Sequence, residues 1–146
     1  MKVEEILKSK GRSVETIEPA ATIAEAVRRL NGPPRIGALV VLAEDWRRVA
    51  GMITERNIIR ALGNHGAGLL GMQVRDVMSR NVPACSPQDS IARLAQEMTT
   101  SRYRHLPVVH RGELVGLVSI GDVVKARLTD MELETGLLRD LCIVRS

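Results

Sequence analysis

The most regular hydrophobic pattern in the chain lies between residues 104 and 124. Val, Leu and Ile fill Leu106–Val109 and Leu114–Ser119 almost without alternation, which is typical of β-strands covered on both faces. Arg111–Gly112 separates the two runs, and the glycine favours a tight turn because a positive φ costs it least. Oxygen-bearing side chains follow at Ser119 and Asp122, and this spacing predicts the start of a helix. The pattern therefore predicts a β-hairpin followed by a helix.

This hairpin-and-helix pattern occurs twice. Val109 lies 68 residues after its counterpart Val41, but Asp122 lies only 65 residues after Asn57, because the first hairpin is three residues longer around residues 43–49. The matching segments are Val3–Leu7 with Val74–Met78, Ile36–Val41 with Arg104–Val109, and Gly51–Asn57 with Gly116–Asp122. Two copies of one supersecondary unit thus account for nearly the whole chain.

Helical and strand periodicity predicts the other elements. Thr22 with Glu25 three residues later is a capping-box pattern, and it predicts the start of a helix in the first copy. The predicted elements are a helix over 3–8, a strand over 14–17, a helix over 23–30, strands over 36–42 and 49–53, a helix over 55–62, a helix over 74–79, a strand over 82–85 and a helix over 89–100. The glycine-rich residues 63–68 predict a flexible connector. Beyond Thr129, a segment without a counterpart in the first copy predicts an extra C-terminal helix.

Composition excludes several classes of protein. With 146 residues and a hydrophobic fraction of 45%, the chain can form one compact body, and its core is aliphatic because there is no Phe, one Trp and one Tyr. The N-terminus lacks the apolar core of a signal peptide, and no apolar run approaches the length of a membrane helix. Cys85 and Cys142 are too few and too far apart for a disulfide framework or a zinc motif. We therefore expect a soluble cytoplasmic protein with no metal site and no membrane partner.

The net charge of +4 is carried by small groups of arginines rather than by one long basic stripe. Surfaces that bind nucleic acids usually add aromatic side chains for stacking, and this chain has almost none, so nucleic acid is not the expected partner. Arginine groups are commonly solvated, but the planar guanidinium also suits a phosphate. There is no nucleophile elbow, P-loop, Cys-x-x-Cys or pair of carboxylates in an apolar setting, so we do not expect an enzyme.

Three motifs, each present twice and in the same order, resemble those of cystathionine β-synthase (CBS) domains. They are the opening Val74–Met78, the strand Arg104–Val109 and the ending Gly116–Asp122, and the resemblance covers about residues 1–128. It implies a tandem CBS pair, or Bateman module, of the stand-alone signal-transduction type found in bacteria. The implied fold is α/β (α+β), with two β-α-β-β-α repeats related by a pseudo-twofold axis. The corresponding divisions are repeat 1 over 1–63, a Gly-rich connector over 64–73, repeat 2 over 74–128 and a C-terminal helical extension over 129–146.

The resemblance also implies two clefts between the repeats, where such modules bind adenine nucleotides, nicotinamide dinucleotides or S-adenosylmethionine. In the family, the motif Asp holds the ribose hydroxyls, the Ser or Thr lies beside the sugar and phosphate, and the preceding strand walls the adenine. Carried onto this chain, these roles give the nucleotide-binding candidates Ile17, Ile36, Gly37, Ala38, Thr54, Arg56 and Asn57 in repeat 1, and Val82, Ala84, Arg104, His105, Leu106, Pro107, Ser119 and Asp122 in repeat 2.

The motif residues also have structural explanations. Ser119 and Asp122 form a helix capping box, which needs no ligand, although a helix start also offers unpaired N–H groups to an anion. His105 could be a core histidine or, beside Arg104, could face a phosphate. Pro107 within a strand predicts an edge or an interrupted ladder, which would leave room for an adenine.

Two hypotheses of function remain. The first is a regulatory module that binds AMP, ADP, ATP or NAD, with S-adenosylmethionine as a further candidate, and modulates a protein target. The alternative is a structural dimerisation module whose clefts stay empty. A homodimer is expected in either case, because stand-alone CBS pairs usually dimerise and Leu137, Leu138 and Leu141 would leave an apolar helix face to cover. Asn57 stands where the family usually has Asp, so the cleft at Asp122 is expected to bind more tightly.

Overall fold

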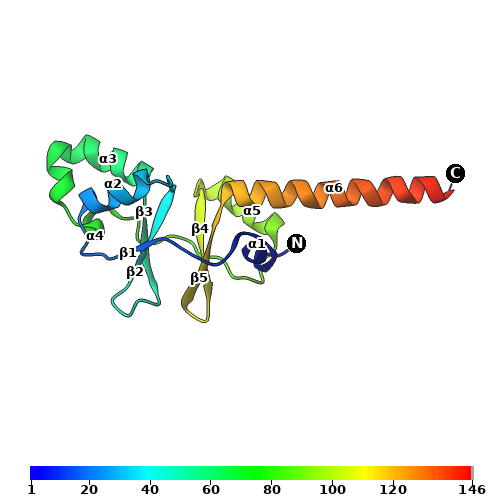
Figure 1. Cartoon of the computed structure of the whole chain (residues 1–146), viewed down its shortest axis with the longest axis horizontal. Coiled ribbons are helices and arrows are strands. Elements are labelled where there is room, and N and C mark those ends of the chain that lie inside the picture. Colours follow the sequence, from blue (N-terminus) through cyan, green and yellow to red (C-terminus); the bar gives the residue numbers. More distant parts are fainter. Residues whose placement is uncertain (146) are drawn as a thin grey trace.

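The computed structural model describes the backbone of residues 1–145 and the side chains of residues 1–142, and Ser146 of the predicted C-terminal extension lies outside the described residues. Two small sheets stand next to each other, with helices gathered above and beside them (Figure 1). Each half combines a hairpin with flanking helices, so the predicted α+β class is confirmed.

The first copy contains a three-stranded sheet in the order β1-β2-β3. Its elements are α1 (Val3–Lys10), β1 (Thr16–Ile17), α2 (Ile23–Asn31), β2 (Ala38–Leu42), β3 (Val49–Thr54), α3 (Glu55–His65) and the 3₁₀ helix η1 (Gly66–Gly71). Strand β1 pairs parallel with β2, and β2 pairs antiparallel with β3. The predicted cap is present, since Thr22 Oγ1 accepts the backbone N–H of Glu25 at 3.2 Å.

The second copy contains a two-stranded antiparallel sheet, β4-β5. Its elements are α4 (Val74–Val77), α5 (Ile91–Ser101), β4 (His105–His110), β5 (Glu113–Ser119) and α6 (Ile120–Arg145). Arg111 and Gly112 form the tight turn with φ angles of 53° and 78°. The strand predicted over 82–85 is wrong, because only Cys85 bridges to Val108. A longer ladder is disfavoured there since Pro83 has no N–H to donate.

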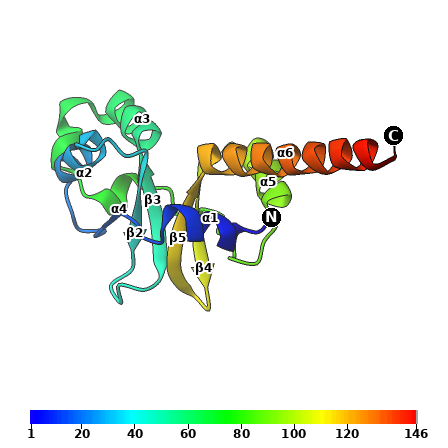
Figure 2. The ribbon, with the colours of Figure 1, turned by 45° about the vertical axis from the view of Figure 1, so that its right-hand side comes forward.

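The helix that opens each copy packs on the other copy. Side chains of α1 are buried in a core made by the second copy, and α1 lies against β5 in Figure 2. Side chains of α4 are likewise buried in the core of the first copy. The α1 residues are Val3, Ile6 and Leu7, and the α4 residues that join the first core are Val74 and Val77. The two copies are therefore interlocked rather than consecutive.

Equivalent hydrogen bonds fix both exchanged helices. The N–H of Val3 donates to the carbonyl of Asp89 at 3.0 Å, and the N–H of Val74 donates to the carbonyl of Ala21 at 2.8 Å. Asp89 and Ala21 are 68 residues apart and occupy the same place in the two copies. A third core lies between the sheets and joins Ala38, Val40, Leu42 and Met52 to Leu114 and Leu117.

The glycine of each repeated motif allows the exchanged segment to come close. A Cβ on Gly116 would lie 2.6 Å from Leu7 Cδ2, and a Cβ on Gly51 would lie 2.4 Å from the carbonyl oxygen of Ser79. Ser79 follows α4 and forms two backbone hydrogen bonds with Met52, of 3.0 and 2.9 Å. The motif glycine is therefore required by the packing of the opening segment of the other copy.

Two other segments differ from the sequence prediction. Residues 63–68 are not a flexible connector, because α3 continues to His65, η1 follows, and Leu69 of η1 is buried in the first core. The C-terminal helix is not separate, because α6 runs unbroken through Gly136 to Arg145. Within residues 1–145, no helix combines the length and apolar character that crossing a bilayer requires.

We expect Gly51→Ala to destabilise the fold by about 3 kcal/mol and Gly116→Ala by about 1 kcal/mol. The new methyl group meets a fixed backbone oxygen in the first variant and the end of a flexible leucine in the second. Urea denaturation followed by circular dichroism measures both. Gly63→Ala is the control, because its helical position is open and alanine is the better helix former. Equal losses at Gly51 and Gly116 would contradict the explanation by close approach.

Candidate ligand-binding site

Ser119 and Asp122 lie where β5 ends and α6 begins, and they cap the helix reciprocally. The N–H of Ser119 donates to Asp122 Oδ2 at 2.9 Å, and the N–H of Asp122 donates to Ser119 Oγ at 3.1 Å. The predicted capping box is therefore present. Asp122 Oδ1 accepts no hydrogen bond from any of the residues that the structure describes. The cap thus uses one oxygen of the carboxylate and leaves the other available.

Lys10 brings a positive charge to the same place. Its Nζ lies 2.7 Å from Asp122 Oδ2 and 3.0 Å from the carbonyl oxygen of Leu117. Lys10 is the last residue of α1, so it reaches Asp122 only because α1 packs on the second copy. Its side chain is 37% exposed and that of Asp122 24%, so solvent or a ligand can reach the pair.

Opposing effects act on the pKa of Asp122. Burial alone would raise it, but the hydrogen bond from Lys10 and those from Ser119 outweigh burial, so the pKa lies below its ordinary value. Asp122 is therefore charged at neutral pH. Because its pKa is lower in the folded state, the stability that the carboxylate contributes is present above the ordinary pKa of Asp and is lost as pH falls through the lowered value.

The equivalent place in the first copy is closed by internal hydrogen bonds. Asn57 Oδ1 accepts from both the N–H (3.0 Å) and the hydroxyl (2.8 Å) of Thr54. Asn57 Nδ2 donates to Ser79 Oγ at 2.9 Å, and the N–H of Asn57 donates to Thr54 Oγ1 at 3.3 Å. Ser79, just after α4, thus reaches Asn57 much as Lys10, the last residue of α1, reaches Asp122. The only side-chain acceptor of Asn57 is already used, and the site carries no charge at this position.

His105 lies between the two copies. It is the counterpart of Gly37, 68 residues earlier, and a Cβ on Gly37 would be 2.9 Å from His105 Nε2. Equivalent residues of two pseudo-symmetric copies meet only near the axis that relates them, so His105 lies close to that axis. Burial and the charges of Lys10 and Arg104 lower its pKa, against the opposing effect of Asp122. The imidazole is therefore mostly neutral at pH 7, and a nearby phosphate would raise its pKa.

Two arginines stand at the helix starts without side-chain partners among the described residues. Arg56 is the second residue of α3, close in sequence to Thr54 and Asn57, and it is exposed. Arg104 is exposed too, and its carbonyl accepts the N–H of Ile120 at 2.8 Å, which holds it beside the start of α6. Both guanidinium groups are free to contact an anion.

The other predicted residues do not all face an open cleft. Ile17 and Leu106 are 3% and 0% exposed and lie in the cores. In this structure they could support the residues around a ligand but could not contact the ligand themselves. Pro107 is on a strand edge, as predicted, but its carbonyl accepts the N–H of Cys85 at 3.0 Å, so that edge is covered. Among the remaining candidates, Ala38 is buried, Ile36 and Val82 are half-buried, and Gly37 and Ala84 are exposed.

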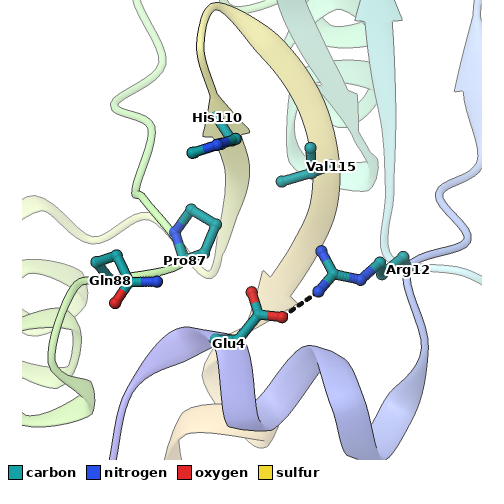
Figure 3. A pocket seen from close by; sticks show the side chains of 6 residues that line it. All are labelled: Glu4, Arg12, Pro87, Gln88, His110 and Val115. Atoms are coloured by element: carbon teal, nitrogen blue, oxygen red, sulfur yellow. Dashed lines mark hydrogen bonds and ion pairs between the residues drawn. The ribbon is translucent and has the colours of Figure 1, made fainter.

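Two surface hollows lie elsewhere. The first, of about 420 Å³, is lined by Glu4, Arg12, Pro87, Gln88, His110 and Val115 (Figure 3). The second, of about 370 Å³, is lined by Glu18, Pro19, Ala20, Leu42, Ala43, Glu44, Trp46 and Arg75. Neither includes a predicted nucleotide-binding residue, and in the first the Glu4 carboxylate is paired with the Arg12 guanidinium. Because Asp122, Lys10 and His105 converge from three elements, we take the β5–α6 junction as the candidate site.

Sequence reasoning missed Lys10 and Ser79. Lys10 ends the opening helix of the first copy and Ser79 lies just after that of the second, so each reaches the motif of the other copy through the exchange. The duplication alone does not say whether an opening helix packs on its own copy or on the other one. Only a comparison of the two opening segments with the two motifs could have suggested these residues.

The site combines a charged acceptor, an ammonium group and a histidine at a helix start, a set that suits sugar hydroxyls and a phosphate. Nucleophilic chemistry has little support at the buried cysteine, since burial, with Asp89 and Glu97, raises the pKa of Cys85 to about 12 and keeps the thiol protonated. No group of three metal-binding side chains occurs in the part of the chain that the structure describes.

These features define a class of protein: two interlocked α+β repeats with a polar site at the junction of strand and helix. The family model for the CBS domain matches residues 3–64 and 74–129, so the chain belongs to the CBS domain family. It is a pair of CBS domains, which is a regulatory module.

Known proteins with similar sequences and structures agree with this assignment. The CBS domain-containing protein CBSX3, mitochondrial, of Arabidopsis thaliana is 33% identical over 131 residues, which are 85% of this chain and 63% of that protein. The crystal structure of the CBS-domain containing protein ATU1752 from Agrobacterium tumefaciens has a TM-score of 0.82 and 41% identity over 87% of this chain and 99% of that one. The CBS domain pair of protein MJ0100, solved with 5′-methylthioadenosine and S-adenosyl-L-methionine, has a TM-score of 0.75 and 24% identity over 90% and 98% of the two chains.

We predict that Lys10→Met raises the pKa of Asp122, because burial then acts against a weaker stabilisation of the carboxylate. Carbon-13 NMR titration of the carboxyl group measures the shift directly. Arg12→Met is the matched control, since Arg12 pairs with Glu4 and not with Asp122. An unchanged titration of Asp122 in Lys10→Met would show that the ion pair does not form in solution.

Proposed function

We propose that this CBS pair is a regulatory module that binds an adenosine-containing ligand, such as AMP, ADP, ATP or NAD, at the β5–α6 junction. The observation that carries the proposal is the carboxylate of Asp122, which is charged, has one oxygen free and lies beside a lysine at the start of a helix. Neighbouring ribose hydroxyls are good donors to such a carboxylate. The adenosine derivatives bound by the CBS pair of protein MJ0100 support the ligand class.

The proposed contacts follow from the positions of the charges. Asp122 Oδ1 accepts from the ribose hydroxyls while Oδ2 keeps the cap of α6. Lys10 and Arg104 both carry positive charge close enough to act on His105, so they would attract a phosphate there, and His105 would gain a proton more readily once the phosphate is present. Lys10 must then share its bond to Asp122 with the ligand, so it is the residue whose position reports whether the site is filled.

The proposed regulation is a shift of population. A ligand held by Lys10 of α1 and Asp122 of α6 touches segments from both ends of the chain, and His105 lies against Gly37 near the axis between the copies. Binding would favour the arrangement of the two copies in which these groups converge. A protein target that recognises this arrangement would then sense the ligand.

We expect unequal affinities at the two equivalent places. Asp122 can offer a charged acceptor, whereas Asn57 is neutral and its oxygen is occupied by Thr54. Hydrogen bonds to charged groups exceed neutral ones by roughly 1 kcal/mol, so the Asp122 site should be tighter by about fivefold or more.

Calorimetric titration with AMP and NAD of Asp122→Asn and Asn57→Asp tests the proposal. Asn57 shows that an asparagine can cap a helix at this place, so Asp122→Asn should stay folded, and we expect it to lose about fivefold or more in affinity at the tighter site. Asn57→Asp should strengthen or create a second binding event. Unfolding curves of both variants serve as the control for folding.

Wild-type binding by Asp122→Asn would mean that Asp122 is only a helix cap. Adenine selectivity is checked in the same series, and GTP binding as tight as that of AMP or NAD would contradict the proposed class. If none of these nucleotides nor S-adenosylmethionine binds, the alternative of an interaction module with empty clefts is favoured.

The alternative rests on one observation of its own. Large apolar side chains are exposed on α3 and α6, including Ile59 at 70% and its counterpart Val124 at 52%. Such surfaces commonly mark protein interfaces. We propose a homodimer in either case.

A further inference from the structure

Helix α6 extends well beyond the body of the protein. Its 26 residues correspond to about 39 Å. The first part packs on α5 and α1 through the buried Val123 and Ala126, and Asp130 lies 3.6 Å from the N-terminal amine. The rest projects freely in both views (Figures 1 and 2). A projecting helix of this length is not stabilised by its own chain and is a candidate for pairing.

An exposed apolar stripe runs along α6 on the side away from the body. We call it the outer stripe and define it as Val124, Leu128, Met131, Thr135 and Leu138. The intervals between these residues are four, three, four and three, which is the 3.5-residue repeat of a coiled coil. Its four large side chains are 52% to 64% exposed. Val123 and Ala126 face the core, and none of the residues whose side chains the structure describes covers the outer stripe.

Charges flank the outer stripe in alternating sign. Lys125, Glu132 and Arg139 lie one residue after Val124, Met131 and Leu138, on one side of the stripe. On the other side, Arg127 and Glu134 lie one residue before Leu128 and Thr135. Residues at these flanking places set the choice and direction of a partner helix. None of the five forms an ion pair with any residue that the structure describes.

We propose that the outer stripe is a dimerisation surface that pairs antiparallel with α6 of a second copy of this chain, centred between Thr129 and Asp130. In this register Leu128 packs on Met131 of the second copy and Val124 on its Thr135. Arg127 then faces Glu134 of the second copy, and Lys125 faces its Glu132. Every flanking pair nearest the centre is attractive, and each occurs twice because of the twofold symmetry.

The antiparallel register covers more apolar surface than a parallel one. A parallel pair in register would also bring Arg127 to Glu132, but it would leave Ile120 and Leu141 uncovered and place Thr135 on Thr135. The antiparallel register brings Leu141 to Ile120 of the second copy. It therefore covers six of the eight exposed large apolar residues of α6: Ile120, Val124, Leu128, Met131, Leu138 and Leu141, with only Leu133 and Leu137 left.

A charge exchange tests the surface and its direction together. We expect Arg127→Glu and Glu134→Arg each to weaken dimerisation roughly tenfold in sedimentation equilibrium, because each places like charges opposite one another. The double variant Arg127→Glu/Glu134→Arg should regain the wild-type dissociation constant. In a parallel dimer the same double variant would place a new negative charge on Glu132 and a new positive charge on Arg139. It would then be weaker than either single variant, which would overturn the proposal.

Leu128→Glu and Leu133→Glu form a matched pair of apolar-to-charged changes on the same helix. Both side chains are exposed, at 56% and 61%, but only Leu128 belongs to the outer stripe. We expect Leu128→Glu to give a monomer and Leu133→Glu to remain a dimer, with equal helix content by circular dichroism. A wild-type monomer at high micromolar concentration, or a dimer insensitive to Leu128→Glu, would refute pairing through this stripe.

Discussion

The exchange of the two opening helices holds the two copies together. Each helix fills the core of the copy that it does not belong to in sequence, and the motif glycines Gly51 and Gly116 leave the space for it. Neither copy has a complete core without the other. The burial of apolar residues of α1 and α4 therefore holds the two copies in one orientation.

The same constraint builds the candidate site. Because α1 ends against β5, Lys10 meets Asp122, and because α4 ends against β3, Ser79 meets Asn57. The two places are equivalent in the fold but opposite in chemistry. One is a partly exposed ion pair with a free carboxylate oxygen, and the other is a neutral cluster in which the amide oxygen is already bonded. A duplicated fold can thus hold a charged, partly open cap in one copy and a neutral, internally bonded cap in the other.

Much of the fold could be predicted because local chemistry specifies it. Short sequence patterns predict the turn at Arg111–Gly112, the caps at Thr22 and Ser119 and the apolar strands. The duplication strengthens these predictions, because the same order of elements is expected in both copies. The exchange could not be predicted, because the pattern of Val3, Ile6 and Leu7 fits a core of either copy. Lys10 was missed for the same reason. Gly136 costs a helix only about 1 kcal/mol, which is too little to end α6.

We propose that the ligand binds at the β5–α6 junction and not in the hollow beside Gln88 and His110. A proton–nitrogen NMR titration with AMP, on assigned backbone amides, tests this most directly. We expect the largest shifts at Lys10, His105, Ser119 and Asp122, with smaller changes at Thr54 and Asn57. Largest shifts at Gln88, His110 and Val115 instead, or no shift at all, would contradict it.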